Sequence, residues 1–457
     1  MPIHVTITTG HSAPEAVSIP YDLTRNIDWK KYAKEIDEVI STVDVLPPEE
    51  EYRFLVELIL KCAQSAQRKR FTGTTVQQRR PTFWWDKECT AATEEKSKTF
   101  VEFRRSGVVA VFTLYLALDR KCKNLYRAKK RAYWRNFVDG LTRETSMSTL
   151  WKTAKRMRNR YSENESEHCS DRWIYDFAKK VCPDSVPSSR LFNDTPGHGH
   201  GFDYPFSMVE FSIALLSCNN SAPGLDSIKF NLLKNLPDSA KKRLLDLFNE
   251  CVEQNIVPQE WRQVKVIAIR KPGKPASDHN SYRPISMLSC IRKLLEKMIL
   301  CRLDHWVESN NLLSNTQFGF RRGKGTNDCL ALLASELQLT FEQKLEMPSV
   351  FLDIKGAFDS VSIEILFEKF VTNGLSSILC NFLYNLLSVK SMSFTGGTIA
   401  LTRISYMGLP QGSCLSPLLY NFYVNKIDDC LVGKCTLRQL ADWREKVTIV
   451  INHCRIP

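Results

Sequence analysis

The chain has 457 residues, of which 43% are hydrophobic and 25% are charged, and it carries a formal net charge of +13. This balance is typical of a globular protein with a substantial buried core, and it excludes global disorder. The fifteen cysteines are scattered singly without a CxxC pair, which excludes a disulfide framework and a zinc module.

The N-terminus has no basic segment followed by an apolar core, so no signal peptide is predicted. The longest apolar run, residues 108–118, is too short to cross a bilayer. We therefore expect a soluble intracellular protein without a membrane partner. The sequence carries no explicit signal that would choose between nucleus and cytoplasm.

Positive charge is concentrated in one segment. Residues 120–160 contain 14 Lys and Arg against two acids. Residues 90–141 are almost free of Gly and Pro, and Tyr126, Tyr133 and Phe137 recur at helical spacing within them, so we predict a helix with an aromatic face and a basic face. Such a surface indicates a polyanion, most often nucleic acid, although a merely solvated basic face is the alternative. The candidate contacts are Lys129, Lys130, Arg131 and Arg135.

Two polar stretches, residues 161–171 and 193–205, read as linker. After residue 206 the sequence alternates between helical and strand patterns. The expected elements are helices over 207–218 and 238–254, a strand at 264–270 that runs into a Pro/Gly turn, a strand at 348–354, a helix from about Ser362, a hairpin over 391–406 with Gly396-Gly397 at its tip, a helix over 415–431, and strands at 436–440 and 447–451 joined by a tight turn at Ala441-Asp442.

Two acids lie at the ends of these predicted strands, Asp353 and Asp442. An ionised carboxylate at the end of an apolar strand is unfavourable unless a cation neutralises it. Two such carboxylates side by side can hold a pair of Mg²⁺ ions and support in-line phosphoryl transfer. Either Asp taken alone is more often a cap or a salt-bridge partner.

Four motifs give a more specific indication. YMGLPQGSCLSPLLYNFYVNKID (406–428) and FLDIKGAFDSV (351–361) resemble motifs B and A of reverse transcriptases. RKPGKPASDHNSYRPISMLSCIRKLLEKMI (270–299) and NTQFGFRRGKGTNDCLALL (315–333) resemble the fingers motifs of the non-LTR (LINE-type, jockey-like) enzymes. A weaker resemblance over residues 27–206 is to the segment that links endonuclease and polymerase in these elements.

The resemblance implies a right-hand polymerase of α+β class, with fingers and a partial palm made of an antiparallel sheet with helices, preceded by a mainly helical basic region. The implied domains are residues 1–205 as the basic linker region, 206–345 as the fingers, and 346–457 as the palm. MPIHVTITT resembles the stretch that comes after the final catalytic His of the endonuclease. We therefore expect Met1 to follow a missing nuclease domain.

The resemblance also implies a role for each matching residue. Asp353, the Ile354 carbonyl and Asp442 correspond to the metal ligands, and the family uses two Mg²⁺ ions, which Mn²⁺ can replace. Phe358 corresponds to the steric gate that excludes a ribose 2′-hydroxyl, with ordinary core packing as the alternative. Gln411 is expected near the incoming nucleotide.

Further residues match the groups that surround the substrates. Gly412 lets the backbone come close to the nucleotide. Lys271 and Arg283 match the cations that hold the triphosphate, and Lys274 could replace Lys271. Asp359 matches no metal ligand. The implied partners are an RNA template, a DNA primer and dNTPs, and the sequence does not indicate an oligomeric state. The residues that match the template-contacting motif are Gln317, Phe318, Gly319 and Arg321.

The chain departs from the family at motif C, an aromatic-Ala-Asp-Asp turn that here reads Leu440-Ala441-Asp442-Trp443. Only 14 residues come after Trp443, so the remaining palm and the thumb are expected to be absent and this copy to be inactive. The sequence does not distinguish a true end from a frameshift. A non-catalytic nucleic-acid-binding protein derived from a retrotransposon is the alternative. A viral RNA polymerase would lack LPQG, and the aromatic-basic linker argues against a group II intron maturase.

Overall fold

The computed structural model describes residues 27–67, 84–106, 109–140, 171–186, 190–192 and 204–453, with gaps at 272–273, 276, 348, 355, 397–398, 426–434 and 442–446. The chain forms two compact units. The larger consists of residues 1–68 and 168–457, and the smaller of residues 69–167. Within the described residues, no helix combines the length and the apolar character needed to span a membrane.

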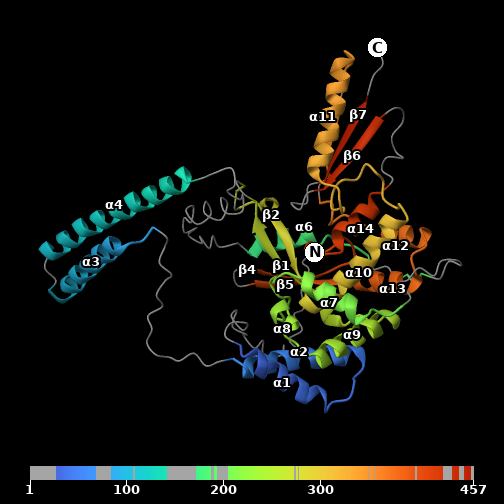
Figure 1. Cartoon of the computed structure of the whole chain (residues 1–457), viewed down its shortest axis with the longest axis horizontal. Coiled ribbons are helices and arrows are strands. Elements are labelled where there is room, and N and C mark those ends of the chain that lie inside the picture. Colours follow the sequence, from blue (N-terminus) through green and yellow to red (C-terminus); the bar gives the residue numbers. More distant parts are fainter. Residues whose placement is uncertain are drawn as a thin grey trace, which may run out of the picture. The chain divides into compact units, whose positions relative to one another are not determined.

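The smaller unit is a pair of long helices that pack side by side, α3 (Lys87–Ser106) and α4 (Val109–Asp139) (Figure 1). The predicted helical region is therefore divided: α3 ends just before Gly107, a residue type that is unfavourable inside helices. Tyr126, Tyr133 and Phe137 are partly buried on one face of α4, while most of its cations are exposed. The predicted aromatic and basic faces are confirmed.

The larger unit begins with helices that pack around α9. Tyr32 donates a hydrogen bond from its hydroxyl to the Leu232 carbonyl, 3.2 Å away. Ser207 caps α7 in a reciprocal capping box with Glu210, as the polar residue before an apolar run predicts. The elements of this part are α1 (Trp29–Ile40), α2 (Pro48–Ser65), α6 (Asp171–Val181), α7 (Met208–Ser217), α8 (Phe230–Lys234), α9 (Asp238–Glu253) and the 3₁₀ turn η1 (Gln259–Arg262).

A four-stranded sheet has the order β2-β1-β4-β5. Its strands are β1 (Gln263–Arg270), β2 (Tyr282–Met287), β4 (Lys390–Gly396) and β5 (Ile399–Ser405), and a short 3₁₀ turn, η2 (His279–Ser281), precedes β2. β1 pairs in parallel with β4, so this sheet is mixed and not purely antiparallel as predicted. Local sequence patterns do not predict this pairing, because β4 comes from a later part of the chain and adds to the free edge of β1 in the β1–β2 pair.

A second sheet has the order β3-β7-β6 and is antiparallel. Its strands are β3 (Ser349–Asp353), β6 (Cys435–Ala441) and β7 (Val447–His453). The predicted final pair of strands is confirmed. The turn was predicted at Ala441-Asp442, but Ala441 is still part of β6, paired with Val447, and residues 442–446 are outside the described residues.

α12, α13 and α14 contribute with α10 to one buried core, whereas α11 is largely exposed and lies beside the second sheet (Figure 1). Buried apolar side chains line most of α10, and the rings of Phe370 and Phe422 stack with their centroids 4.1 Å apart. The predicted helix over 415–431 is found as a shorter one that ends at Tyr423. These helices are α10 (Cys290–Ser309), α11 (Thr326–Glu342), α12 (Ile363–Thr372), α13 (Ser377–Ser388) and α14 (Ser416–Tyr423).

A buried ion pair joins the N-terminal helices to the rest of the larger unit. Arg243 on α9 donates from Nε and Nη2 to the carboxylate of Glu51 on α2, at 2.6 and 2.9 Å. It also donates to the carbonyls of Val43 and Asp44, each at 2.7 Å. Both charged side chains are buried, so each depends on the other for its neutralisation.

Replacement of Arg243 by Met should leave Glu51 buried and unpaired, and should lower the free energy of unfolding by about 3–5 kcal/mol. Urea unfolding followed by fluorescence measures this change. The matched control is Arg53→Met, because Arg53 on α2 and Glu260 in η1 form an exposed pair. Equal decreases in the free energy of unfolding for the two substitutions would contradict the stabilising role of the buried Arg243–Glu51 pair.

Candidate active site

The end of the second sheet brings together the strand ends on which the two predicted metal ligands depend. Asp353 is the last residue of β3 and is paired with Thr448 of β7. Thr448 is in turn paired with Leu440 of β6. Because β7 runs antiparallel to both neighbours, β3 and β6 end at the same edge of the sheet, about 10 Å apart at two strand spacings.

The side chains at this edge are not all described. Asp442 and Trp443 come directly after β6 in the sequence but are outside the described residues, as is the side chain of Asp353. Among the side chains that are described, no group of three or more His, Cys, Asp or Glu is placed to hold a metal ion. The metal-binding roles of Asp353, Ile354 and Asp442 therefore stay predictions.

The loop Gly408–Gly412, which carries Gln411, is anchored to separate parts of the larger unit. Its Gly408 N–H donates to the Val361 carbonyl at 2.8 Å, and its Leu409 N–H donates to the Phe358 carbonyl at 2.8 Å. The Gln411 carbonyl accepts the N–H of Ser286 on β2 at 2.7 Å. The loop thus connects the segment after β3 with the four-stranded sheet.

Two glycines permit this close packing. A Cβ on Gly412 would lie 2.5 Å from the Ser286 carbonyl oxygen, and one on Gly408 would lie 2.8 Å from the Asp359 carbonyl oxygen. Both residues have positive φ, +133° and +79°, which disfavours any side chain. The close packing of Gly412 against Ser286 is a separate finding, and its predicted approach to a nucleotide stays a prediction.

Two ionisable side chains lie beneath this loop. Asp359 accepts a long hydrogen bond from Gln411 Nε2, at 3.4 Å, and Lys390 Nζ donates to the Gly408 and Leu387 carbonyls at 3.0 and 2.7 Å. Burial raises the pKa of Asp359 to about 6 and lowers the pKa of Lys390 to about 7. Both residues line a narrow pocket with Gln411.

Phe358 lies directly below the same loop. Its side chain is only 4% exposed, and its ring packs against that of Tyr420 with the centroids 5.1 Å apart. This position fits the packing alternative, and it also fits a gate residue at the floor of a nucleotide site. Its role as a steric gate stays a prediction.

The predicted triphosphate ligands lie on the β1–β2 hairpin and its connection. Arg283 is paired with Ile269, and both are on the sheet face opposite to Pro284 and Ser286. Pro284 and Ser286 line the pocket with Asp359, whereas Arg283 does not. Ile269 is 50% exposed, so Arg283 shares an open sheet face and not the enclosed pocket.

Lys271 and Lys274 come after β1 in a turn. The backbone N–H of Lys274 donates to the Lys271 carbonyl at 3.3 Å. The Lys271 ammonium donates to the Asn280 carbonyl at 3.1 Å, and the side chain stays partly exposed. The choice between the two lysines as the triphosphate ligand stays open.

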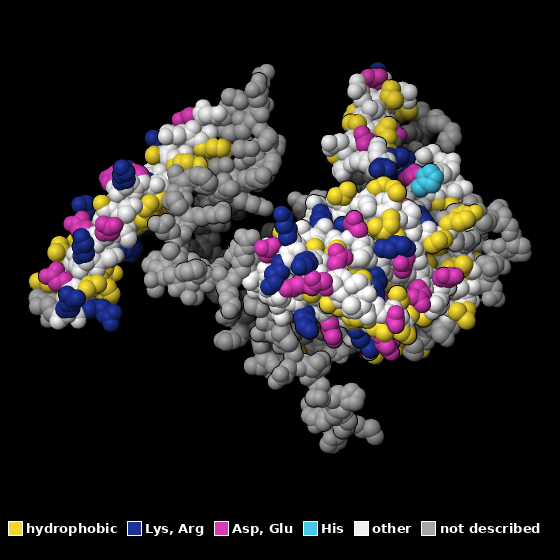
Figure 2. All heavy atoms as spheres, turned by 60° about the horizontal axis from the view of Figure 1, so that its bottom comes forward, with side chains coloured by type: hydrophobic (Ala, Val, Ile, Leu, Met, Phe, Trp, Pro, Cys, Tyr) yellow, Lys and Arg dark blue, Asp and Glu magenta, His cyan; other side chains and the backbone are white. Residues whose placement is uncertain are grey.

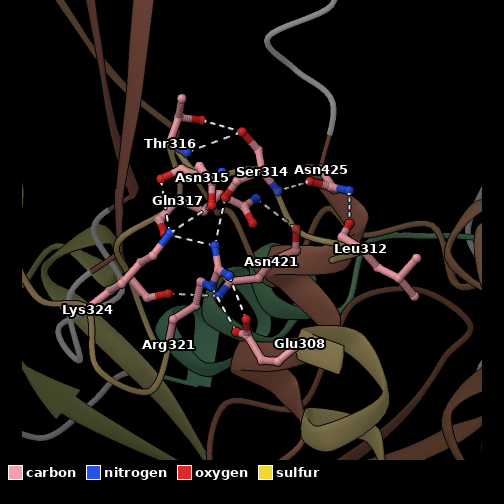
Figure 3. Close-up of polar contacts among 11 residues, drawn as sticks. Glu308, Leu312, Ser314, Asn315, Thr316, Gln317, Arg321, Lys324, Asn421 and Asn425 are labelled. Atoms are coloured by element: carbon pink, nitrogen blue, oxygen red, sulfur yellow. Dashed lines mark hydrogen bonds and ion pairs between the residues drawn. The ribbon is translucent and has the colours of Figure 1, made fainter. Parts of the chain in front are cut away.

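The loop that contains the predicted template motif is bonded to α14, as Figure 3 shows. Gln317 donates from Nε2 to the Asn421 carbonyl at 2.9 Å, and Asn421 donates from Nδ2 to the Gly319 carbonyl at 2.8 Å. Asn425 accepts the Ser314 N–H at 3.0 Å and donates to the Leu312 carbonyl. These bonds fix the loop to the helix that comes after Gln411 in the sequence.

Arg321 is part of this internal network. Its guanidinium forms a bidentate ion pair with Glu308, at 2.9 and 2.6 Å, and donates to the Ser314 carbonyl at 2.7 Å (Figure 3). The side chain is 7% exposed. Phe318 is also buried, with the Lys324 ammonium 5.6 Å from its ring centroid. Arg322 is exposed and makes no ion pair with a described residue.

Sequence reasoning missed four residues that organise the site. Asn421 and Asn425 are separated by one helical turn in the apolar run SPLLYNFYVN, and an amide in such a run is the signal that could have found them. Lys390 and Glu296, whose carboxylate accepts the hydroxyl of Ser413 next to the loop at 2.7 Å, carried no such signal. Their importance depends on burial by segments distant in the sequence.

The predicted basic contacts are found on α4 in the smaller unit. Lys129 forms ion pairs with Asp86 and Glu88, each at 2.6 Å, and the Lys129 ammonium holds the pKa of the Asp86 carboxyl at about 2. Arg131 and Arg135 are exposed, and Lys130 is partly buried. On the face shown in Figure 2, Lys and Arg side chains of this unit are interspersed with Asp, Glu and apolar ones.

Comparison with known proteins supports the predicted resemblance. Residues 269–450 match the family described as reverse transcriptase (RNA-dependent DNA polymerase). A probable RNA-directed DNA polymerase from transposon BS of Drosophila melanogaster is 32% identical over 205 residues, which cover 44% of this chain and 22% of that protein. The probable RNA-directed DNA polymerase from transposon X-element of the same species is 32% identical over 246 residues, 52% of this chain and 27% of that protein.

The RNA-directed DNA polymerase from mobile element jockey of Drosophila funebris is 26% identical over 382 residues, which cover 76% of this chain and 41% of that protein. The chain thus spans less than half the length of these relatives. The family match lies over the strands, loops and helices that form the site described above. Residues 269–450 therefore match the reverse transcriptase family, and the chain is similar to RNA-directed DNA polymerases of transposons and of the mobile element jockey.

Proposed function

We propose that this chain contributes the fingers and part of the palm of an RNA-directed DNA polymerase, which transfers a nucleotide from a dNTP to a primer 3′-hydroxyl on an RNA template. The observation that carries the proposal is the row formed by Asp353, Thr448 and Leu440 across the second sheet. It brings the end of β3 and the end of β6 to one edge. Two carboxylates at such an edge can share divalent ions.

In this proposal Asp353, the Ile354 carbonyl and Asp442 would hold the metal. Oxygen ligands at strand ends suit Mg²⁺, and reverse transcriptases generally use divalent metals. When bound, the metal supplies activation of the attacking hydroxyl and stabilisation of the pyrophosphate that leaves. The chain's own contribution is to hold the ends of β3 and β6 in the same register, because both strands pair with Thr448 of β7.

Substrate binding would fall to residues outside this edge. Phe358 and Gln411 belong to segments that are bonded to each other, and both residues are buried; in this proposal they would contact the incoming nucleotide. Arg283 offers a planar guanidinium for phosphate oxygens on an open sheet face. In the template loop, Arg321 would shape the backbone through Glu308, while the exposed Arg322 would meet the phosphates.

The residue after Asp442 weakens this site. The family has a second Asp where this chain has Trp443, so one acidic group and its charge are missing from the metal site. Metal-assisted transfer depends on that charge to place the ions. We therefore propose that the chain as it stands has little or no polymerase activity.

A second function is favoured by the smaller unit. Residues 120–139 contain eight Lys and Arg but a single acid, Asp139. Within the described residues only Lys123 and Lys129 of these eight are paired with carboxylates. We propose that this unit binds nucleic acid through the other six cations. This binding would persist in a chain without polymerase activity.

Replacement of Trp443 by Asp should restore single-nucleotide addition at most, because it returns the missing carboxylate but changes nothing else in the site. The assay is extension of a DNA primer on an RNA template with dNTPs and Mg²⁺. Asp353→Asn in the Trp443→Asp background should abolish the addition. Glu346→Gln, at an exposed acid seven residues before Asp353, is the matched control and should not.

Products of many nucleotides from the unchanged chain would contradict the proposed inactivity. Addition that survives Asp353→Asn would contradict the role of the strand-end carboxylates. Reactions without the RNA template are the control for nucleotide addition that does not depend on the template.

Replacement of Phe358 by Val in an active background should increase incorporation of rNTPs relative to dNTPs. The smaller side chain would leave room for a 2′-hydroxyl. The measured quantity is the ratio of kcat/KM for dTTP and UTP. Tyr420→Phe, which keeps the ring against Phe358, is the control for altered packing. An unchanged ratio would mean that Phe358 only fills the core.

Triple replacement of Arg127, Arg131 and Arg135 by Gln should weaken binding to nucleic acid and flatten its salt dependence. If about three phosphates are no longer neutralised, the slope of log K against log[salt] should fall by about 2–3. The control replaces three exposed lysines of the larger unit, Lys30, Lys34 and Lys61. A slope that falls equally in the two triple variants would contradict a specific role of the smaller unit.

A further inference from the structure

The loop Gly408–Gly412 has two partners that no comparison with reverse transcriptases assigns, Asp359 and Lys390. Asp359 is six residues after Asp353, and Lys390 is the first residue of β4. They reach the loop from different elements and contact different atoms of it. Lys390 Nζ holds the Gly408 carbonyl at the start of the loop, and Asp359 Oδ1 accepts from the Gln411 side chain near its end.

The contact with Asp359 determines how the Gln411 amide is oriented. An ionised carboxylate can only accept hydrogen bonds, so it selects the NH₂ end of the amide and turns the carbonyl oxygen away. Gln411 is 9% exposed, and its Oε1 has no hydrogen-bond partner among the described residues. A buried acceptor without a partner is unfavourable. Among the described residues, the Gln411 amide is therefore held at its NH₂ end, by Asp359.

The contact with Lys390 holds Gly408, the first residue of the loop, in place. Lys390 is 2% exposed, and its two bonds to the Leu387 and Gly408 carbonyls link the end of α13 to the loop. Lys390 and Asp359 line one pocket with Gln411 and Ser286. The pocket encloses about 20 Å³, which is room for about one water molecule. It is thus too small for a nucleotide and supports the loop from below.

We propose that Asp359 and Lys390 are positioning residues for nucleotide addition: Lys390 anchors the loop at Gly408, and Asp359 holds the Gln411 side chain, so that the loop keeps its position over Phe358. This inference rests on the proposed function. It goes beyond that function because neither residue would touch the metal, the primer or the nucleotide. Both act through the loop.

The first test measures the loop and needs no polymerase activity. Hydrogen exchange is followed at the Gly408 and Leu409 amides, whose bonds to the Val361 and Phe358 carbonyls report on the loop. Lys390→Met should speed their exchange about tenfold, because it leaves a buried carbonyl unpaired. Lys369→Met is the matched control, since Lys369 Nζ also donates to a backbone carbonyl, that of Tyr423 at 2.6 Å, but lies outside the loop.

The second test measures nucleotide addition in the Trp443→Asp background, with dTTP on an oligo(dT)-primed poly(rA) template. Asp359→Leu should raise the KM for dTTP about tenfold and change kcat less, since the Gln411 side chain is no longer held. Asp359→Asn keeps an acceptor oxygen and should recover most of the loss. In a Gln411→Met background, Asp359→Leu should add nothing, because the two residues act as a unit.

The outcomes separate the two proposals. No dTTP addition by Trp443→Asp would overturn the proposed function, while the exchange data would still decide whether Lys390 holds the loop. Equal exchange in Lys390→Met and Lys369→Met would overturn the anchoring role of Lys390. Additive effects of Asp359→Leu and Gln411→Met on KM would overturn the role of Asp359 in holding Gln411. If Asp359→Leu does not fold, as judged by circular dichroism, Asp359→Ala replaces it in the same cycle.

Discussion

The buried ion pair between Arg292 and Glu296 is the interaction on which the site depends. Both side chains are fully buried on α10, with Nε and Oε1 2.8 Å apart. Arg292 also donates to the Trp261 carbonyl just before β1, and Glu296 accepts the Ser413 hydroxyl at 2.7 Å. Loss of either charge would leave the other unpaired in the core. One helix therefore fixes the four-stranded sheet and the loop that carries Gln411 relative to each other.

Around this pair, the larger unit presents two loops from one scaffold. The loop Gly408–Gly412 lies over Phe358 and is bonded to β2. The template loop is bonded to Asn421 of α14 and to Asn425 just after its end (Figure 3). α14 begins four residues after Gly412. A displacement of α14 would therefore move both loops together. The loop that carries Gln411 thus leads into α14, and the loop with the template motif is held to the same helix by hydrogen bonds.

The two units differ in how their charges are used. In the larger unit two ion pairs, Arg243 with Glu51 and Arg292 with Glu296, are buried and hold packed elements together. In the smaller unit most described cations of α4 are exposed. A buried pair contributes little field outside the protein, whereas exposed like charges attract a polyanion over a distance set by salt. This difference supports separate roles in folding and in nucleic-acid binding.

The sequence by itself determined the resemblance to reverse transcriptases, the strand-end position of Asp353, the β4–β5 hairpin and the two faces of α4, because motifs and periodicity are local properties of the chain. It did not reveal the parallel pairing of β1 with β4, the Asn421 contacts or the role of Lys390. Arg292 and Glu296 read locally as an ordinary helical i, i+4 pair, which is usually exposed. Only the tertiary structure buries them, because the segments that cover them lie tens to hundreds of residues away, and burial is what converts a weak surface pair into a constraint on the site.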